Sequence, residues 1–270
     1  MNIADIMVYP IKSLRGSPVD ESLLCSYGLE HDRQWMLVDS ESKMITQREC
    51  PRIATLVPNV EDGRLRITLP AGGEIVASLG ADGWTGEPVT VDVFGSVYVG
   101  VAAGEAVNAS LSDTIGVACR LVSIRSDVFR TKHAVAFHDD SPVLVISRAS
   151  LDELNTRLQA PLPMNRFRPN LVVEDAKPFE EDVWQRIALG DTVLRAVKQC
   201  ERCVTTTVDQ AAGVFAGLEP LKTLATFRRK GQNVAFGQYF RPENSGAILR
   251  RGDEVRILEW APEAAARVAN

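Results

Sequence analysis

The cysteines of the segment Cys200-Glu201-Arg202-Cys203 are the residues whose type and spacing suggest chemistry most directly. Such a pair can form a redox dithiol, contribute to a zinc site, pack as buried thiols, or supply a soft thiolate to a metal delivered by a cofactor. A redox dithiol needs its first cysteine at a helix N-terminus. The β-branched run at residues 204–208 instead predicts a strand directly after the second cysteine.

The other interpretations of this segment depend on its surroundings. Zinc needs four ligands, and neither the three remaining cysteines nor the three histidines stand at ligand spacing. Arg202 argues against simple packing, because a guanidinium beside a thiol favours the thiolate and can also hold an anion. The metal-thiolate interpretation requires an anion-binding site nearby. Packing, zinc and the metal thiolate all stay open on the residues alone.

The segment Arg166-Phe167-Arg168-Pro169-Asn170 is a candidate for that anion site. On an extended segment both arginines leave one face while the phenylalanine enters the other. The proline favours the extended form at the residue before it. Two guanidinium groups on one face can bind phosphate bidentately. A solvent-exposed strand edge that carries two charges is the alternative interpretation.

Further cationic groups stand near the start of the chain. Lys12 and Ser13 follow the first predicted strand in a turn, and both suit an anion. Arg33 shares one face of a predicted strand with Trp35. It is either a rim residue with a solvated head group or a ligand.

Two adjacent carboxylates, Asp139 and Asp140, precede the apolar run at residues 143–146. They are either turn residues or acid/base groups. The sequence contains no recognisable catalytic triad, phosphate-binding P-loop or glycine-rich dinucleotide fingerprint. It therefore suggests neither ATP nor a nicotinamide cofactor as the ligand.

Composition limits the classes of protein to consider. The chain has 270 residues and a formal net charge of −5, which disfavours nucleic acid as a partner. No run of about 18 apolar residues suggests a membrane span, and the start lacks the pattern of a signal peptide. Five cysteines, three of them widely separated, do not form a disulfide framework. We expect a cytoplasmic protein with reduced thiols and no membrane partner.

The elements that must position these residues are mostly short strands. Helices are expected at residues 104–115, from apolar spacing, and after Ser150, from a capping-box pattern with Glu153. We expect a mainly β protein of two domains, residues 1–100 and 101–270. The predicted strands are Asp5–Tyr9, Val19–Cys25, Arg33–Val38, Ile53–Val57, Leu65–Leu69, Ile75–Leu79, Val89–Phe94, Leu171–Glu174, Ile187–Leu189, Val193–Val197 and Val204–Val208.

Taken together, these segments resemble the MOSC family, the molybdenum-cofactor sulfurase C-terminal domain, in the form that has an N-terminal β-barrel domain. Within it, the chain is most similar to the amidoxime-reducing components and their bacterial counterparts. The resemblance covers nearly the whole chain. It rests on Tyr9-Pro10-Ile11-Lys12-Ser13, Asp32-Arg33-Gln34-Trp35, Arg166-Phe167-Arg168-Pro169-Asn170, Trp184, Leu189-Gly190-Asp191, Cys200-Glu201-Arg202-Cys203, Thr206-Thr207-Val208-Asp209 and Phe236-Gly237-Gln238-Tyr239.

The resemblance implies a molybdenum cofactor with Cys203 as the protein ligand of the metal. It further implies β-barrel domains and an acidic residue near the metal at Asp139. The positions that match the family's pterin- and phosphate-binding residues are Lys12, Ser13, Arg33, Asp140, Ser141, Arg168, Asn170, Arg202 and Tyr239.

The same resemblance implies an oxidoreductase that reduces small N-hydroxylated compounds. This chain lacks the cysteine cluster of the ferredoxin domain found in some relatives and the pyridoxal-phosphate domain of the sulfurases. Electrons are therefore expected from a separate protein, such as a ferredoxin, a cytochrome b5-like protein or a flavin reductase. The alternative function is a carrier module for molybdenum cofactor or for sulfur.

Overall fold

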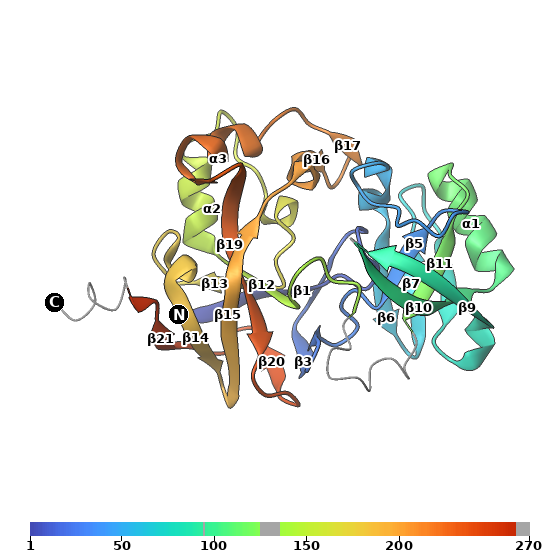
Figure 1. Ribbon diagram of the computed structural model, residues 1–270, viewed down its shortest axis with the longest axis horizontal. Coiled ribbons are helices and arrows are strands. Elements are labelled where there is room, and N and C mark those ends of the chain that lie inside the picture. The colour runs from blue at the N-terminus through green and yellow to red at the C-terminus, as the bar shows by residue number, and fades with distance from the viewer. Residues whose placement is uncertain (94, 125–135, 263–270) are drawn as a thin grey trace.

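The computed structural model describes residues 1–93, 95–124 and 136–262. Strands make up most of its regular structure, and they form two bodies that lie next to each other (Figure 1). This confirms the prediction of a mainly β protein with few helices. Within the described ranges, no helix combines the length and the hydropathy needed to cross a membrane.

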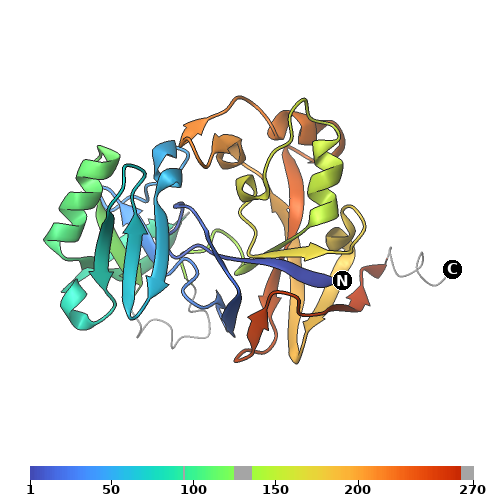
Figure 2. The same ribbon diagram turned by 180° about the vertical axis from the view of Figure 1, so that it is seen from behind.

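The larger body is built on nine strands that form one sheet. They are β1 (Asn2–Val8), β2 (Ser17–Val19), β12 (Val143–Ser147), β13 (Leu171–Glu174), β14 (Trp184–Leu189), β15 (Thr192–Glu201), β18 (Arg229–Lys230), β19 (Asn233–Pro242) and β21 (Val255–Trp260). Their order is β2-β1-β13-β12-β19-β15-β14-β21, with β18 paired to β19. β12 and β13 run parallel, and the other neighbours run antiparallel. Figure 2 shows β1 leading from this body toward the smaller one.

The expected closure of this sheet into a barrel is not confirmed. Among the described strands the ladders form an open path from β2 to β21. One isolated bridge, between Asn2 and Glu254, joins β1 to the residue before β21. The backbone N–H of Ile3 also donates to the carbonyl oxygen of Asp253 at 2.9 Å. The Gly252 N–H donates to the Ile3 carbonyl at 2.8 Å and the Val255 N–H to the Met1 carbonyl at 2.9 Å, so the two segments lie side by side over a short stretch without forming a strand ladder.

Among its described residues, the smaller body contains two sheets and one α-helix, α1 (Glu105–Ile115). The sheet orders are β5-β11-β10-β9 and β6-β7-β8. The expected domain boundary at residue 100 falls inside β10, whose sheet also takes in β11. The strands are β5 (Trp35–Val38), β6 (Val57–Glu61), β7 (Arg64–Thr68), β8 (Glu74–Ser78), β9 (Trp84–Val93), β10 (Ser96–Ala103) and β11 (Arg120–Ile124).

A third small sheet borders the larger body and pairs residues from both ends of the chain. Its order is β20-β3-β4. β20 (Ile248–Arg250) is the partner of β3 (Glu21–Cys25), which also pairs with β4 (Gly28–Leu29). The remaining short elements are η1 (Pro51–Thr55), η2 (Ala81–Gly83), η4 (Met164–Arg166), η5 (Glu180–Val183), η6 (Val204–Thr207), β16 (Val208–Asp209) and β17 (Val214–Phe215).

Each face of the large sheet has its own apolar core, and β19 contributes to both. Phe240 packs with Trp184 in one core, whereas Phe236 packs with Phe167 in the other, beneath α2 (Arg148–Asn155) and α3 (Leu221–Phe227). Strict alternation would place residues 236 and 240 on one face. Gly237, with φ 84°, interrupts it, and an added Cβ there would lie 2.6 Å from Ile146.

The structure confirms the helix predicted at residues 104–115 and moves the start of the next one. α1 ends at Gly116, whose φ of 68° is the left-handed conformation common after helices. In α2 the N-cap is Ser147, whose hydroxyl accepts from the N–H of Ser150 at 3.1 Å. The prediction that Ser150 caps the helix was wrong, because an equally suitable hydroxyl stands three residues earlier.

Two predicted strands are short 3₁₀ helices instead. In place of the strand expected at Ile53–Val57, η1 covers residues 51–55 with Pro51 in its first turn, and β6 begins only at Val57. The run after Cys203 forms η6, because Thr206 donates its hydroxyl to the Cys203 carbonyl at 2.9 Å and Thr207 donates to Val204 at 2.8 Å. Such backward hydrogen bonds compete with a strand ladder. The N-cap of η6 is Cys203, not Cys200.

Candidate functional site

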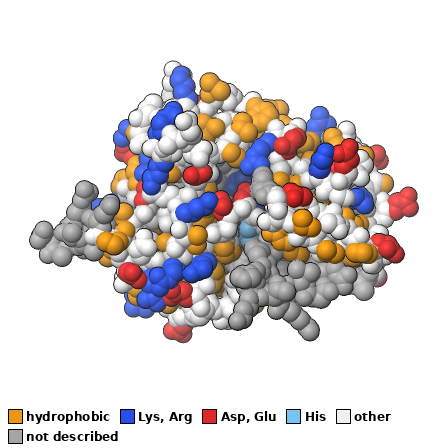
Figure 3. Space-filling view, in the orientation of Figure 1, with side chains coloured by type: hydrophobic (Ala, Val, Ile, Leu, Met, Phe, Trp, Pro, Cys, Tyr) orange, Lys and Arg blue, Asp and Glu red, His pale blue; other side chains and the backbone are white. Residues whose placement is uncertain are grey.

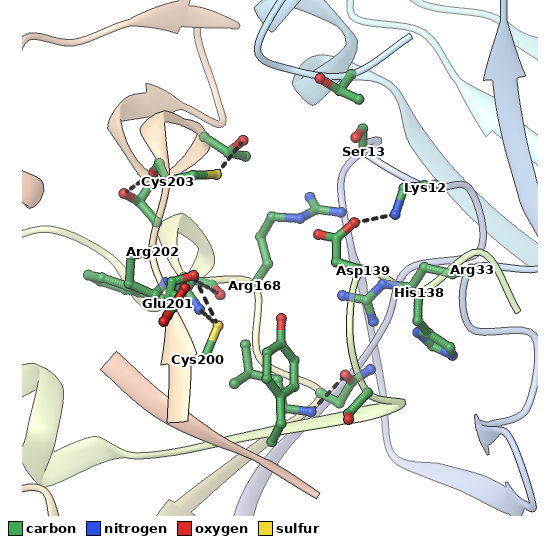
Figure 4. Close-up of a pocket in the computed structure, with 18 of the residues that line it drawn as sticks. Lys12, Ser13, Arg33, His138, Asp139, Arg168, Cys200, Glu201, Arg202 and Cys203 are labelled. Atoms are coloured by element: carbon green, nitrogen blue, oxygen red, sulfur yellow. Dashed lines mark hydrogen bonds and ion pairs between the residues drawn. The ribbon is translucent and has the colours of Figure 1, made fainter. Parts of the chain in front are cut away.

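A pocket between the two bodies collects most of the predicted site residues. Figure 3 shows a hollow there with Lys and Arg side chains in it. In Figure 4 the cysteines lie on one side of the pocket and Lys12 and Asp139 on the other, with Arg168 reaching between them. Ten of the eleven predicted site residues line it: Lys12, Ser13, Arg33, Asp139, Ser141, Arg168, Asn170, Arg202, Cys203 and Tyr239.

Two of the pocket's arginines are held by one aromatic ring. The Tyr9 ring lies 4.1 Å from the Arg33 guanidinium carbon and 4.4 Å from that of Arg168. Tyr9 is fully buried and donates its hydroxyl to the Pro169 carbonyl at 2.9 Å. Burial raises its pKa to about 12, so the phenol stays neutral. A neutral ring stacked on both cations fixes them without neutralising either one.

Arg33 is paired with a buried carboxylate. Its Nη1 lies 2.5 Å from Asp32 Oδ2, and Asp32 also accepts from the N–H of Tyr9 at 2.8 Å. The His138 Nδ1 lies 3.7 Å from the same Asp32 oxygen. Burial lowers the pKa of His138 to about 4, against the opposing effect of Asp32, so the imidazole is neutral at pH 7. Arg33 therefore carries the positive charge that balances Asp32.

Lys12 and Asp139 form a second ion pair at the pocket. Lys12 is 4% exposed and donates to the Phe137 carbonyl at 2.8 Å. Burial lowers the pKa of Lys12, and Asp139 opposes that shift. Partial burial would raise the pKa of Asp139, but Lys12, Arg33 and Arg48 outweigh it and hold the pKa below its usual range. Its carboxylate is therefore ionised and, at 52% exposure, faces the open pocket.

Arg168 has no carboxylate partner among the described residues. Its Nη1 donates to the Leu14 carbonyl at 2.6 Å. Burial lowers the pKa of Arg168 to about 10, which leaves it charged at neutral pH. With φ 55°, Arg168 adopts the left-handed backbone conformation. The prediction of an extended segment was wrong here, because η4 and this turn separate the two arginines.

The neighbouring Arg166 consequently points elsewhere. It donates to the Thr207 carbonyl at 2.8 Å and lies 3.2 Å from Asp209 Oδ2. Its side chain is buried, borders the pocket and is bound to η6 through Thr207. The expected fork of two arginines on one face is therefore replaced by Arg168 in the pocket and Arg166 in a supporting contact.

The two cysteines have different surroundings. Cys200, at the end of β15, is 3% exposed and accepts a hydrogen bond from Arg202. Arg202 also donates to the Phe167 carbonyl and stacks over that ring at 5.5 Å. Cys203 is more exposed and lies 3.4 Å from Thr205 Oγ1. Burial would raise the pKa of Cys203, but hydrogen bonds from Thr205 and Arg48 lower it below the usual value.

The remaining predicted residues have distinct positions. Asn170 is committed to the backbone, since it accepts from the Leu144 N–H and donates to the Met7 carbonyl, both at 3.2 Å. Tyr239 lines the pocket, and burial raises its pKa well above the usual value. Asp140 does not line the pocket: it pairs with Lys198 at 2.8 Å on the surface. The role in cofactor binding that the family resemblance implies for Asp140 stays a prediction.

The chemistry of this pocket fits an anionic cofactor that carries a thiophilic metal. Six cationic side chains line it against two carboxylates, Asp139 and Glu201. The buried Arg202 Nε has no hydrogen-bond partner among the described residues. Within the same residues, no three His, Cys, Asp or Glu side chains gather where they could hold a metal ion. One thiolate and two arginines without a described carboxylate partner, Arg168 and Arg202, suit an anionic group that brings its own metal ligands. The cations are Lys12, Arg33, Arg48, Arg166, Arg168 and Arg202.

Comparison with known proteins agrees with this chemistry. Residues 132–256 match the family model of the MOSC domain, and residues 1–118 match that of the MOSC N-terminal beta barrel domain. The mouse protein named mitochondrial amidoxime-reducing component 1 is 35% identical over 95% of this chain and 82% of its own length. The chain belongs to the MOSC family, in the form with the N-terminal beta barrel domain. The match confirms the resemblance inferred from the sequence motifs.

Two further relatives show the breadth of the family. Mitochondrial amidoxime reducing component 2 of rat is 34% identical over 94% of this chain and 82% of its own length. The molybdenum cofactor sulfurase of rice is 30% identical over 88% of this chain, which corresponds to 32% of that larger protein. Family members thus carry this two-part unit either as most of their length or as one portion of a larger chain.

Several pocket residues were missed by the sequence analysis. Thr46 and Arg48 come from a loop of the smaller body, and Thr205 and Thr206 belong to η6. His138 adjoins the predicted Asp139 but was not assigned to the site. The run after Cys203 was interpreted only as a strand, so the hydroxyl groups of Thr205 and Thr206 were not considered as pocket residues. For Arg48 no local pattern was available, because its contact to Cys203 spans 155 positions.

Proposed function

We propose that this chain binds a molybdenum cofactor and reduces small N-hydroxylated compounds with electrons supplied by a separate protein. The family membership and the names of its relatives support the reaction. The observation that carries the proposal is the position of Cys203, a partly exposed thiol with a lowered pKa that faces a pocket lined by cations. When bound, the cofactor supplies the two-electron chemistry and the other ligands of the metal.

The chain's own residues divide the work of binding. Cys203 Sγ serves as the thiolate ligand. Arg168 and Arg202 hold the anionic part of the cofactor, because their positive charge has no carboxylate partner in the described structure. Lys12 and Arg33 add to the field of the pocket but are already paired with Asp139 and Asp32.

The Lys12–Asp139 pair is placed to deliver protons. Reduction of an N–OH group to N–H consumes two electrons and two protons and releases water. Asp139 is ionised and open to the pocket, and Lys12 is buried with a lowered pKa, which makes its ammonium a readier proton donor. A proton from Lys12 Nζ can reach the departing oxygen through the Asp139 carboxylate, and solvent then reprotonates the pair.

The test is production in a host that makes molybdenum cofactor, followed by elemental analysis and an assay of N-hydroxy substrate reduction with reduced viologen. We expect bound molybdenum and turnover, both abolished by Cys203→Ala. Cys200→Ser is the matched control and should keep most of the metal, since Cys200 lies buried under Arg202. Equal loss from both variants would contradict the assignment of a single ligand.

The outcomes also separate the alternative function. Stoichiometric molybdenum without turnover on any N-hydroxylated substrate would favour the carrier function over the enzyme. Metal-free wild-type protein would overturn both functions. The identity of the electron donor and the cytoplasmic location stay predictions. Pull-down with a ferredoxin, a cytochrome b5-like protein and a flavin reductase, followed by turnover with each, tests the donor directly.

A further inference from the structure

A loop of the smaller body reaches the cysteine that we assign to the metal. Arg48, between β5 and η1, places its Nη2 3.5 Å from Cys203 Sγ. This geometry is that of a hydrogen bond from a guanidinium to a sulfur acceptor. Cys203 itself belongs to the larger body, between the end of β15 and η6. The contact therefore joins the two bodies at the wall of the pocket.

The same loop is anchored at its neighbouring residue by a reciprocal pair of amides. Gln47 Nε2 lies 3.1 Å from Gln210 Oε1, and Gln210 Nε2 lies 2.8 Å from Gln47 Oε1. Gln47 also donates to the Ser13 carbonyl at 2.6 Å. Gln47 and Gln210 are 0% and 2% exposed. Buried amides with satisfied hydrogen bonds specify one arrangement of the segments that carry them.

The turn that carries Arg48 is also ordered from within. The Thr46 hydroxyl donates to Glu49 Oε2 at 2.5 Å and accepts from the N–H of Arg48 at 3.1 Å. The Glu49 carboxylate accepts from the N–H of Thr46 at 3.1 Å. On the other side of the contact, Gly213 lies so near Arg52 that an added Cβ would be 2.9 Å from its Cα. The loop and the segment after Cys203 are therefore packed closely.

We propose that Arg48 is a positioning residue for the metal thiolate and that the smaller body thereby completes the cofactor site. The inference rests on the proposed function and deepens it. A hydrogen bond to a ligand sulfur withdraws electron density from it and changes the reduction potential of the metal. Arg48 holds the Cys203 sulfur in one orientation and makes the bound metal easier to reduce.

The test uses the holoprotein and three readouts: molybdenum content, the sulfur-to-metal charge-transfer absorption and the midpoint potential of the metal. Arg48→Met removes the donor and keeps much of the side chain's length. We expect about a 10-fold weaker retention of the metal, a shifted charge-transfer band and a lower midpoint potential. Arg48→Lys keeps the charge and should restore part of each change.

Arg64→Met is the matched control, because Arg64 is an exposed arginine of β7 in the same body and does not line the pocket. If Arg48→Met fails to fold by circular dichroism, Gln210→Leu tests the proposal, since it disturbs the loop's anchor and leaves Arg48 in place. Gln210→Leu should shift the charge-transfer band and the midpoint potential in the same direction as Arg48→Met, but by a smaller amount.

The results distinguish this inference from the function on which it rests. Wild-type protein without molybdenum would remove the proposed function itself. Wild-type protein with molybdenum, combined with folded Arg48 or Gln210 variants whose retention, band and potential all equal those of wild type, would overturn the role of Arg48 alone.

Discussion

Four of the six cations that line the pocket form two pairs with opposite electrostatic situations. The first pair is bound to carboxylates: Arg33 pairs with Asp32, and Lys12 pairs with Asp139. Arg168 and Arg202, the carbonyl-bound pair, donate to main-chain oxygens and, for Arg202, to a thiol, and no described carboxylate pairs with either. Cationic side chains of the same pocket therefore have different roles. The charge of the first pair is balanced by carboxylates of the protein, whereas the second has charge left for an anionic ligand.

Arg33→Met should have the largest effect on stability. It leaves Asp32 buried at 0% exposure without its main partner. Breaking a buried ion pair from one side costs about 3–5 kcal/mol, so the free energy of unfolding in urea should fall by that amount. The double variant Asp32→Asn/Arg33→Met is the control and should recover part of the loss. A loss as small as that of a surface pair would contradict the comparison.

The second largest effect is expected from acidification, which should lower the free energy of unfolding through His138, the neighbour of the Arg33–Asp32 pair. The pKa of His138 is about 4 in the folded protein against 6.5 for the free side chain, so between these values the unfolded state binds the proton more tightly. Stability therefore falls as the pH drops from 6.5 to 4, by about 3 kcal/mol. Urea denaturation at several pH values measures the slope. In His138→Gln the slope in this window should flatten, and an unchanged slope would assign it to other groups.

Arg168→Met should affect the ligand more than the fold. Removing a charge-assisted hydrogen bond costs about 1.5–3 kcal/mol, which corresponds to about 10- to 150-fold weaker cofactor retention. Molybdenum content after dialysis measures retention, and urea denaturation of cofactor-free protein measures stability. The comparison fails if Arg168→Met lowers stability as much as Arg33→Met and leaves retention unchanged.

Asp140→Asn should have the smallest effect. Asp140 and Lys198 are both close to half exposed, and surface pairs of this kind contribute about 0–1 kcal/mol. Thermal unfolding and molybdenum content should both stay close to those of wild type. Release of the cofactor from this variant would place Asp140 at the site after all and would restore the role that the family resemblance implies for it.

Local patterns predicted much of the fold. The alternation of apolar residues located β7 and β8 to within one residue, and a continuous apolar run located β13 at both of its ends. Helical spacing located α1. Predictions failed where side chains compete with the backbone, as the threonines of η6 do. They also failed where one residue takes the left-handed conformation, as Arg168 does, because neither effect changes the apolar pattern.

By itself the sequence determined that the chain is mainly β, that it belongs with the MOSC proteins, and that the segment around Cys203 is the place to look for a metal thiolate. Only the tertiary structure decided which cations face the pocket unpaired, that Asp140 lies outside it, and that Arg48 reaches Cys203. The reason is physical. The pattern that predicts a strand lies in neighbouring residues. Whether an arginine is paired with a carboxylate depends on segments that are far away in the chain.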